Sequence, residues 1–445
     1  MAKHVPASVV ALALAACAHA PLVDHRAEGQ ALFAHGSYEA ASEALSTALA
    51  QDPHDLAALR TLIESEKKRG TLASFLIKSQ VDAEADPDNA YAQEALGLTL
   101  FAIGDDLPSA RAALKRAVEL APDVADFHYR FGVALYQADR FAEARVPLGR
   151  AALLAPNVVR YRIPLALCAD RLGDAPTARA ALAAITHLAP TPEELALARE
   201  ADRHLVDPFR DFAKLAPGAE PQVQQGLAWL TRDAPTQAID IFGAVLLKFP
   251  KLGMVHALLG LAYARLDEAG RAVSELLRAQ ELTPDAPQPY LYLGDLYFQK
   301  DRAEQAREQY QHVVERDPLD IPARRRLGEL AAARGDWPGA IAVLEIVRTL
   351  SPEDVDARLL LAGAYDKQGN VQAVETELVS LSQRAPNNAQ ARLRLGTFYA
   401  KQSAKASPPA EKQRLAQAAQ KALQETLQLE PENAEAAQML AAIKN

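Results

Sequence analysis

The sequence has little of several things that point to common functions. Only 6% of its 445 residues are aromatic, and it holds two cysteines, Cys17 and Cys168. Two cysteines exclude a disulfide framework and a cysteine-based metal cluster. The net charge of −9 argues against a dedicated nucleic-acid binder, because such proteins normally carry a basic stripe. After residue 20, no apolar run approaches the length that spans a bilayer.

Motifs of catalysis and metal binding are also missing. The sequence has no G-x-x-x-x-G-K-[ST] loop and no G-x-S-x-G elbow, and none of its ten scattered histidines falls in an H-E-x-x-H arrangement. Cys168 lies in the stretch LALCADRLG, where we expect a small buried apolar residue and not a nucleophile. We therefore expect a protein that is not an enzyme, with no catalytic residue, no cofactor and no metal site.

What the sequence does have is a repeat, which prolines mark at a fixed spacing. The gaps are 34 or 35 residues in a first series and 34 in a second, and one more member follows at Pro431. The two series are Pro53, Pro87, Pro122, Pro156, Pro190, and Pro250, Pro284, Pro318, Pro352, Pro386. A period of this length is typical of stacked helical repeats, and the alanine-rich, aromatic-poor composition favours closely packed helices over sheets.

Small residues keep phase with the prolines. Glycine usually stands ten residues after a proline, and alanine follows twelve residues later, with a larger apolar residue such as Leu276 or Tyr310 in the next turn. Small residues are expected where two antiparallel helices approach closely, and the large residue fills the groove between them. A proline cannot continue the second helix, so it forces a turn into the next pair. Gly-Asp pairs, as in RGDWPGA and RLGDAPTA, separate the two helices of a pair.

This pattern closely resembles the tetratricopeptide repeat family. The best repeats, residues 289–318 and 256–284, carry the family's L-G-x-x-Y as Leu293, Gly294, Tyr297 and as Leu259, Gly260, Tyr263. The resemblance covers residues 24 to 445. It implies an all-α fold, a right-handed superhelical solenoid of about eleven helix-turn-helix units.

The repeats predict a domain organisation with one interruption. An array of five repeats over 24–190 precedes an irregular helical insertion over 191–218, and an array of six follows over 219–431. Residues 432–445 are expected to form a capping helix. Within the insertion we predict a helix from about 192 to 206 and a short helical piece around FRDFAKLA. The insertion is either a hinge or a decayed repeat that keeps stacking, and we favour the decayed repeat. The last repeat contains eleven extra residues, expected to loop out or to lengthen its second helix.

The resemblance implies a concave groove that is lined mainly by the first helix of each repeat and binds extended peptides or partner helices. Phases carried over from the family give the candidates for the groove: Arg60, Glu64, Lys67, Tyr129, Arg130, Tyr136, Tyr292, Asp295, Phe298, Gln299, Arg325, Arg326 and Glu329. The run Arg324 to Arg326 is the densest basic stretch. It could pair with a partner carboxylate, although a solvated helix face is the more common explanation.

One subtype of the family is not supported. Chaperone-binding repeats hold a C-terminal carboxylate with lysine and asparagine at matched phases of three consecutive repeats. Here Arg26 and Gln30 stand at the first-repeat positions, and the third repeat offers Tyr91 and Glu94. We therefore do not expect a receptor for chaperone tails.

The N-terminus predicts where the repeats are held. Lys3, a short apolar run from Val9 to Ala16, and then Cys17 have the form of a secretory signal over residues 1–16. The stretch ending at Cys17 resembles the bacterial lipobox, which implies a lipidated Cys17 and a linker over 17–23. Two alternatives remain, namely ordinary cleavage at AHA (18–20) and no processing. In lipoprotein families, Ala18 after the cysteine favours the outer membrane, facing the periplasm.

Together these features predict a non-catalytic scaffold of the bacterial cell envelope with a protein or peptide partner. The partner would belong to an envelope assembly, secretion or polysaccharide-export system. An alternative is a regulatory or substrate-presenting subunit of an envelope peptidase or glycosyltransferase. A soluble, cytoplasmic scaffold is a third hypothesis and requires an uncleaved N-terminus. The membrane would be contacted through the lipid anchor, and no nucleic acid or metal is expected.

Overall fold

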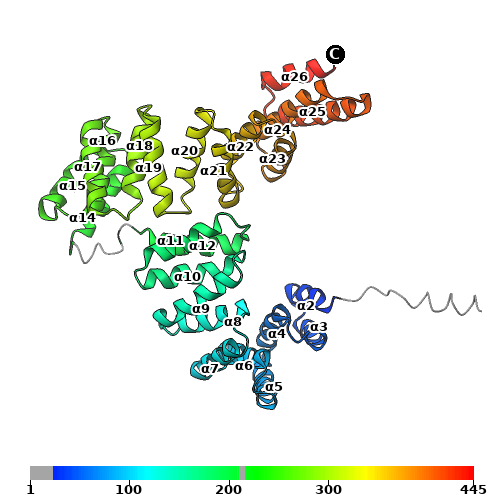
Figure 1. The fold of residues 1–445 in the computed structure, drawn as a ribbon. Helices are drawn as coiled ribbons and strands as arrows, with labels where there is room; N and C mark the ends of the chain where they lie inside the picture. The colour runs from blue at the N-terminus through cyan, green and yellow to red at the C-terminus, as the bar shows by residue number, and fades with distance from the viewer. Residues whose placement is uncertain (1–23, 208, 210–215, 445) are drawn as a thin grey trace, which may run out of the picture. The chain divides into compact units, whose positions relative to one another are not determined.

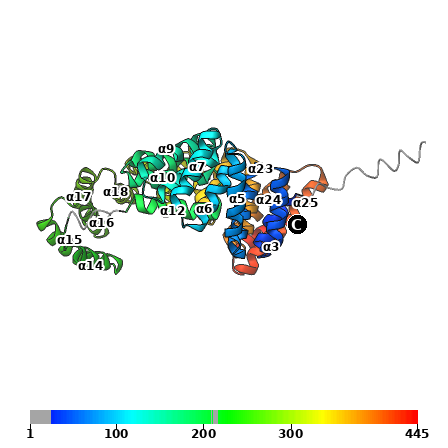
Figure 2. The ribbon, with the colours of Figure 1, turned by 90° about the horizontal axis from the view of Figure 1, so that it is seen from below.

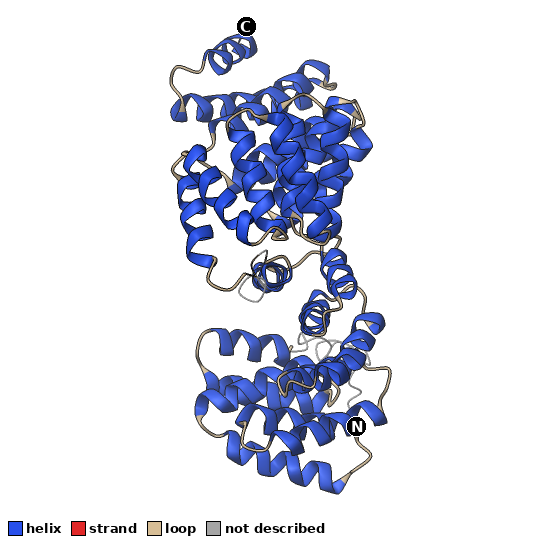
Figure 3. Ribbon diagram, turned by 90° about the vertical axis from the view of Figure 1, so that its left-hand side faces the viewer, coloured by secondary structure: helices blue, strands red, loops and turns tan. Residues whose placement is uncertain are grey.

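The computed structural model describes residues 24–207, 209 and 216–444, and in these residues it contains 24 α-helices and no strand (Figures 1 and 3). The chain divides into two compact units, residues 1–172 and residues 173–445. Each unit is an all-α solenoid of stacked helix pairs, which confirms the predicted fold class. The predicted signal peptide, Cys17 and the linker lie outside the described residues.

The first compact unit consists of four complete helix pairs and the first helix of a fifth. Its helices are α2 (His25–Ala34), α3 (Tyr38–Gln51), α4 (Leu56–Arg69), α5 (Leu72–Ala85), α6 (Ala90–Ile103), α7 (Leu107–Leu120), α8 (Ala125–Tyr136), α9 (Phe141–Leu154) and α10 (Val159–Arg171).

The second compact unit continues the same alternation of helices. It contains α11 (Ala175–Ile185), α12 (Pro192–Leu205), α14 (Glu220–Thr231), α15 (Pro235–Lys248), α16 (Gly253–Arg265), α17 (Ala269–Leu282), α18 (Gln288–Gln299), α19 (Ala303–Arg316), α20 (Ile321–Ala333), α21 (Trp337–Leu350), α22 (Val355–Lys367), α23 (Val371–Arg384), α24 (Ala389–Lys405), α25 (Pro409–Leu429) and α26 (Ala434–Lys444). Helices α14 to α18 form one contiguous stack, seen from a second side in Figure 2.

The predicted phases explain how the two helices of a pair meet. The in-phase alanines and the larger residues between them are all fully buried, namely Ala41, Ala144, Ala238, Ala272, Ala306, Ala340 and Leu45, Leu148, Phe242, Leu276, Tyr310, Leu344. The in-phase glycine of the first helix faces the larger residue of the second. A Cβ added at Gly260 would lie 2.6 Å from the Leu276 Cγ, so only glycine permits this approach. The repeat period therefore fixed the core of each pair.

Turns within the pairs follow the predicted Gly-Asp chemistry. Gly335 adopts a left-handed conformation with φ of 76°, and the next residue, Asp336, caps α21 by accepting a hydrogen bond from the Gly339 amide at 3.0 Å. Other pairs use aspartate itself at the left-handed position, as Asp267 and Asp301 do. Aspartate tolerates this conformation better than most residues, since its short side chain can hydrogen-bond locally.

The irregular segments are helical over most of their described residues. Helix α12 begins after Thr191, whose side chain forms a capping box with Glu194, as the sequence predicted. Residues 208 and 210–215, in the predicted short helical piece, fall outside the described residues. The extra residues of the last repeat lengthen both of its helices, α24 to 17 residues and α25 to 21, so the prediction named only one of the two helices affected.

The terminal helix α26 covers the open apolar face of the last pair. Ala436 of α26 is fully buried, and Met439, Leu440 and Ile443 pack against a cluster that includes Leu423. Glu435 and Gln438 are exposed. This arrangement confirms the predicted capping role, because a repeat array needs a polar outer face at its end. The predicted domain boundaries stay a prediction, and the division between the compact units falls between α10 and α11.

Two glycines of one helix pair offer a matched test of this packing. A Cβ at Gly226 in α14 would lie 2.3 Å from the Phe242 Cε1, whereas a Cβ at Gly243 in α15 would have no described neighbour within 4 Å. Replacing Gly226 by alanine is expected to lower the free energy of unfolding by about 1–3 kcal/mol through overpacking. Replacing Gly243 by alanine is expected to raise it by about 0.5–1 kcal/mol, because alanine favours the helix. Urea unfolding followed by Trp229 fluorescence measures both, and equal effects of the two changes would contradict the close approach.

Candidate functional site

A set of side chains, unnoticed in the sequence, ties a first helix to the proline that precedes it in eight of the eleven repeats. In these repeats the residue six positions after the proline forms a hydrogen bond with that proline's carbonyl oxygen, at distances from 2.7 to 3.4 Å. The set is Gln93, His128, Arg162, His256, Tyr290, Arg324, Arg358 and Arg392. A carbonyl beyond the end of a helix has no intrahelical donor, so these long polar side chains satisfy it. They are structural residues and do not present their donors to a partner.

This set corrects the interpretation of the basic run at 324–326. From the sequence, the three arginines were interpreted as one basic stretch. In the structure Arg324 is buried, and its guanidinium donates to the Pro318 carbonyl oxygen at 2.7 Å. Only Arg325 and Arg326 are partly exposed. The residue type suggested a solvated side chain, whereas the spacing from Pro318 explains the burial.

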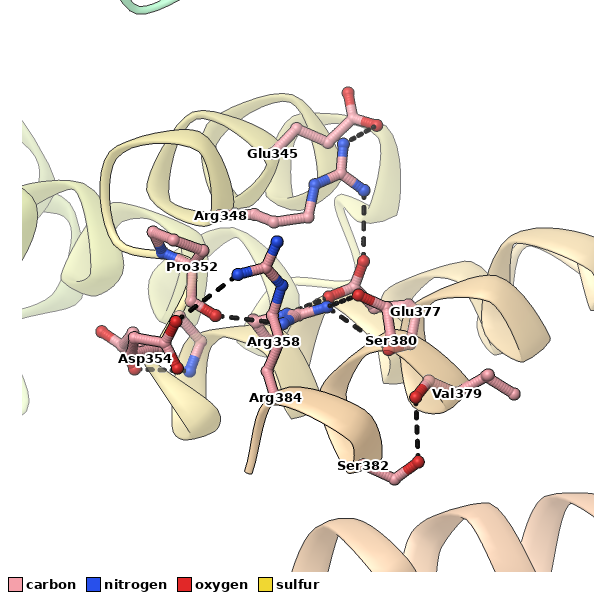
Figure 4. A network of polar contacts seen from close by, with 12 residues as sticks. Glu345, Arg348, Pro352, Asp354, Arg358, Glu377, Val379, Ser380, Ser382 and Arg384 are labelled. Carbon is pink, nitrogen blue, oxygen red and sulfur yellow. Dashed lines mark hydrogen bonds and ion pairs between the residues drawn. The ribbon is translucent and has the colours of Figure 1, made fainter. Parts of the chain in front are cut away.

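Arg358 is the most deeply buried member of the set. Its Nε donates to Glu377 Oε1 at 2.5 Å, and one Nη donates to the Ser380 hydroxyl at 3.0 Å (Figure 4). Arg348 also reaches Glu377, with 3.2 Å between its Nη1 and Oε2. The side chains of Arg358 and Glu377 are only 2% and 3% exposed. This network joins α21, α22 and α23 and lies beneath the surface.

In the second compact unit, the structure brings together four of the predicted groove residues. Arg326 lies over the Phe298 ring at 4.4 Å and donates to Glu329 at 2.7 Å. Asp295 accepts a hydrogen bond from the Tyr310 hydroxyl at 2.7 Å. Burial raises the pKa of Asp295, although the Tyr310 bond and the Arg326 charge oppose this shift.

The remaining predicted residues of this unit are less concentrated. Arg325 lies 3.8 Å from Glu329 and 3.8 Å from Asp354, measured between charged atoms. Tyr292 is half-buried, and burial raises its pKa. Gln299 is exposed at the end of α18. The charges of Arg325 and Arg326 are therefore largely balanced by acidic neighbours of the same unit.

A pocket of about 510 Å³ lies among α22, α23 and α24, and sequence analysis gave no sign of it. Leu359, Leu360 and Phe398 supply apolar walls. At its edge, the Lys401 ammonium lies 2.8 Å from a carboxylate oxygen of Asp366. An apolar cavity with a charged rim can accept one apolar side chain of a partner.

In the first compact unit, the structure brings predicted Arg60 and Arg130 together around a carboxylate that the sequence did not single out. Asp126 is 7% exposed and lies within salt-bridge distance of three guanidinium groups. The nitrogen to oxygen distances are 3.3 Å for Arg60, 3.8 Å for Arg130 and 3.0 Å for Arg160. The Tyr161 hydroxyl also donates to Asp126, at 3.0 Å. We call Arg60, Arg130, Arg160 and Asp126 the arginine cluster.

Beside this cluster lies Glu94, which is fully buried. Neither of its carboxyl oxygens has a hydrogen-bond partner among the described residues. Burial raises the pKa of Glu94 well above its ordinary value, and the negative charge of Asp126 adds to this, against the opposing effect of Arg130 and Arg60. Burial at this place therefore favours the neutral form of the carboxyl group over the charged form.

The other predicted residues of the first unit surround the cluster or lie apart from it. The Tyr129 ring lies 5.0 Å from the Tyr161 ring, and Arg130 lies over Tyr129 at 5.1 Å. Tyr136 packs edge-on against Phe141. Glu64 and Lys67 are exposed on α4. Two of the six predicted residues therefore belong to the arginine cluster itself, and Tyr129 borders it.

The spacing of charged residues in the sequence already indicated the arginine cluster. Arg60 and Glu94 are separated by one repeat, and so are Asp126 and Arg160. Equal phases of successive repeats lie next to each other in a solenoid, so opposite charges one period apart predict neighbours. Cys168 behaves as expected, because it is fully buried and burial raises its pKa to about 11.

Among the described residues, no group of three or more His, Cys, Asp or Glu side chains could hold a metal ion. None of the described helices is both long and apolar enough to cross a membrane.

The stacked helix pairs with partly exposed polar and aromatic side chains define a repeat protein built for binding. Two sequence models described as tetratricopeptide repeat match the chain, one over residues 26–78, 94–158, 258–321 and 291–352, the other over 331–396. Together they cover more than half of the chain, so the protein belongs to the tetratricopeptide repeat family. Proteins of this family are generally scaffolds for protein–protein interaction.

Solved structures are similar only at low identity. YrrB, a TPR protein with an unusual peptide-binding site, is 17% identical over 46% of this chain and 98% of its own, with a TM-score of 0.38. PilF of Pseudomonas aeruginosa is 18% identical over 50% and 97%, with a TM-score of 0.40. PilW, a type IV pilus biogenesis factor, is 17% identical over 52% and 99%, with a TM-score of 0.38. No curated protein matches the sequence.

Proposed function

We propose that the protein is a non-catalytic scaffold that is anchored to the bacterial cell envelope through a lipid on Cys17 and binds a protein or peptide partner with the first helices of its repeats. The partner would belong to an envelope assembly, secretion or polysaccharide-export machine. The observation that carries the binding role is the framework itself, because helix pairs account for nearly every described residue.

The side chains of the first helices that do not pack between repeats support the same binding role. The buried donors at the proline carbonyls and the alanine and glycine phases hold the repeats together. What remains partly exposed on the first helices is chemically varied, with arginines at one place and the apolar pocket of Leu359 and Phe398 at another. A surface of this kind can hold an extended segment at several points, as peptide grooves do.

The envelope location rests on the sequence around Cys17 alone. A short apolar run followed by small residues and a cysteine is what lipid attachment requires, and Ala18 favours the outer membrane as the site of anchoring. More than one acyl chain would make the attachment stable where a single chain gives only marginal binding. The repeats begin at α2, so the linker of 17–23 would hold them near the membrane surface.

One experiment tests both halves of this proposal. The full chain and its Cys17→Ser variant are expressed in a Gram-negative bacterium with a labelled fatty acid, then crosslinked and captured by a C-terminal tag. We expect acyl label and membrane association for the wild-type chain, loss of both for the variant, and the same stoichiometric partner in both captures. Unchanged labelling of the variant would end the lipid-anchor claim.

The capture also separates the two kinds of partner. A structural or export component supports the scaffold, whereas a peptidase or glycosyltransferase whose turnover changes on mixing supports the regulatory subunit. If neither chain captures any stoichiometric partner, the scaffold function is wrong.

A further inference from the structure

We propose that the arginine cluster of the first compact unit is the receptor for an acidic side chain, the carboxylate of an Asp or Glu in an extended segment of the bound partner. This inference rests on the proposed scaffold function and adds to it the chemistry of the partner and the part of the chain that recognises it. It differs from the chaperone-tail receptor, whose first- and third-repeat residues the chain lacks.

The first support is an excess of hydrogen-bond donors. Three guanidinium groups carry roughly fifteen N–H donors, whereas the carboxylate of Asp126 offers about four acceptor positions. The Nε atoms of Arg130 and Arg160 are buried and have no hydrogen-bond partner among the described residues. Glu94 beside them is buried with both oxygens equally unpartnered. Native proteins rarely leave so many buried polar atoms unsatisfied in one place, so the cluster has the form of a site that a ligand completes.

The second support is the local charge. Asp126 contacts all three guanidinium groups and can offset one of their charges, whereas the Glu94 carboxyl makes no hydrogen bond to any of them among the described residues. The site therefore carries an excess of positive charge in a chain whose net charge is −9. Such a site discriminates, because an acidic segment is attracted here and repelled by much of the remaining surface.

The arginines of the second compact unit provide an internal contrast. Arg326 donates to Glu329 at 2.7 Å, and Arg325 lies 3.8 Å from both Glu329 and Asp354. The Arg325 Nε is also buried without a hydrogen-bond partner among the described residues, so the contrast lies in charge, because two arginines there face two carboxylates. In the arginine cluster, three arginines contact one carboxylate, that of Asp126. An acidic partner is therefore expected to choose the first unit over the predicted pair at 325 and 326.

The third support is the order of exposure from the surface inwards. Side chains of Arg60, Arg130 and Arg160 are 24%, 25% and 38% exposed, whereas Asp126 is 7% exposed. A ligand that approaches from solvent meets guanidinium groups before it meets the carboxylate beneath them. The planar guanidinium fork matches a carboxylate, with two parallel N–H donors for its two oxygens.

The shape of the site favours a side chain from an extended segment. Its residues lie on α4, α8 and α10, with Glu94 on α6, so the site draws on four successive repeats. A chain that crosses these helices in extended form passes the cluster and continues past it on both sides. Tyr129, which is partly exposed and packs on the buried Tyr161 ring at 5.0 Å, lies directly beside the cluster and gives the segment an apolar contact.

The test uses the full chain and two fluorescein-labelled peptides, hexaglutamate and hexaglutamine, each amidated at its C-terminus. Fluorescence anisotropy at low and moderate salt measures binding to the wild-type chain, to Arg60→Gln/Arg130→Gln, and to a control, Arg325→Gln/Arg326→Gln. The two double variants change the net charge equally. We expect hexaglutamate to bind more tightly than hexaglutamine, to lose about tenfold or more in affinity with the first variant, and to change less than about twofold with the control.

Folding of the variants is checked by far-UV circular dichroism. If the double variant does not fold, Arg60→Gln alone makes the same comparison, since Asp126 keeps two guanidinium neighbours. Equal losses in the two double variants, or undiminished binding by the first, would overturn the proposal. A third peptide, hexaglutamine with a free C-terminal carboxylate, tests the alternative of a chain end. If it binds as tightly as amidated hexaglutamate, the site recognises a terminal carboxylate and not an acidic side chain.

The crosslinking and capture experiment, repeated with Arg60→Gln/Arg130→Gln, distinguishes failure of the acidic-side-chain receptor from failure of the scaffold function. A partner that is captured equally by the wild-type chain and by Arg60→Gln/Arg130→Gln leaves the scaffold intact and refutes the receptor. Binding of hexaglutamate that depends on the cluster, in a chain that captures no partner, supports the receptor and refutes the scaffold.

Discussion

Replacing Arg358 by alanine is expected to lower the free energy of unfolding of the second compact unit by about 3–5 kcal/mol, which is a large part of the stability of a typical domain. The change leaves the Glu377 carboxylate, 3% exposed, without its closest cation. It also removes the donor to the Pro352 carbonyl oxygen, 3.0 Å away, and to the Ser380 hydroxyl. Arg348 remains at 3.2 Å from Glu377, but it is 37% exposed and compensates only in part.

Two further variants separate charge from packing at this place. Arg348→Ala removes the exposed partner of Glu377 and is expected to cost less than about 1 kcal/mol. The double variant Arg358→Met/Glu377→Leu removes the buried pair together, and it is expected to recover most of the loss, because two apolar residues of similar volume need no partner. Similar stability of Arg358→Ala and the double variant would show that the lost hydrogen bonds of Arg358 to Pro352 and Ser380, and not the unpaired carboxylate, dominate.

The chain provides its own reporter for this measurement. Its two tryptophans, Trp229 and Trp337, both lie in the second compact unit. Urea unfolding followed by tryptophan fluorescence therefore reports on that unit, while far-UV circular dichroism reports on both. We expect the fluorescence midpoint to move and the part of the dichroism change that belongs to the first unit to stay in place.

What the sequence predicted well follows from the period. Gly260 and Leu276 meet because every repeat places a small residue opposite a large one, and the structure confirms this contact. The turn at Gly335 and Asp336 follows from local chemistry, since a left-handed residue and a helix cap are both properties of neighbours in sequence. Both features can be predicted from residues within one repeat, without knowing which residues of other repeats lie nearby.

What the sequence did not predict depends on contacts between repeats. Arg324 looked solvent-exposed because arginine usually is, but its burial depends on an unsatisfied carbonyl of the preceding turn. Glu94 was noted only as the wrong residue for a chaperone-tail receptor. Its burial beside the arginine cluster arises from α4, α8 and α10 together, so it cannot be deduced from one repeat. The partner-binding assignments of all thirteen predicted groove residues stay predictions.

Replacing Glu94 by glutamine is expected to stabilise the first compact unit at neutral and higher pH. Glutamine has the same shape and no charge, so it avoids the cost of either ionising or protonating a carboxyl group in the interior. Burial and the negative charge of Asp126 raise the pKa of Glu94 in the folded chain, despite the opposing charges of Arg130 and Arg60. In the unfolded chain the same group ionises near its ordinary pKa of 4.5.

The sign of the pH dependence follows from this difference. Below pH 4.5 the carboxyl is protonated in both states, and the wild-type chain and Glu94→Gln have similar stability. As pH rises towards the folded pKa, the unfolded wild-type chain has released this proton and the folded chain has not. The wild-type chain then loses about 1.4 kcal/mol per pH unit relative to the variant, which has no such proton to release.

We expect the difference between the two chains to grow to at most about 3.4 kcal/mol at pH 7, which is about 1.4 kcal/mol for each pH unit above 4.5. Urea unfolding at pH values from 4 to 8, followed by far-UV circular dichroism, measures it, with tryptophan fluorescence of the second unit as an internal reference. Glu64→Gln, at an exposed position of α4, is the matched control and should change stability by less than about 0.5 kcal/mol at every pH. A variant less stable than wild type at neutral pH would mean that Glu94 is ionised and paired with the arginines. The cluster would then hold two negative charges, which removes the charge excess on which its affinity for an acidic partner depends.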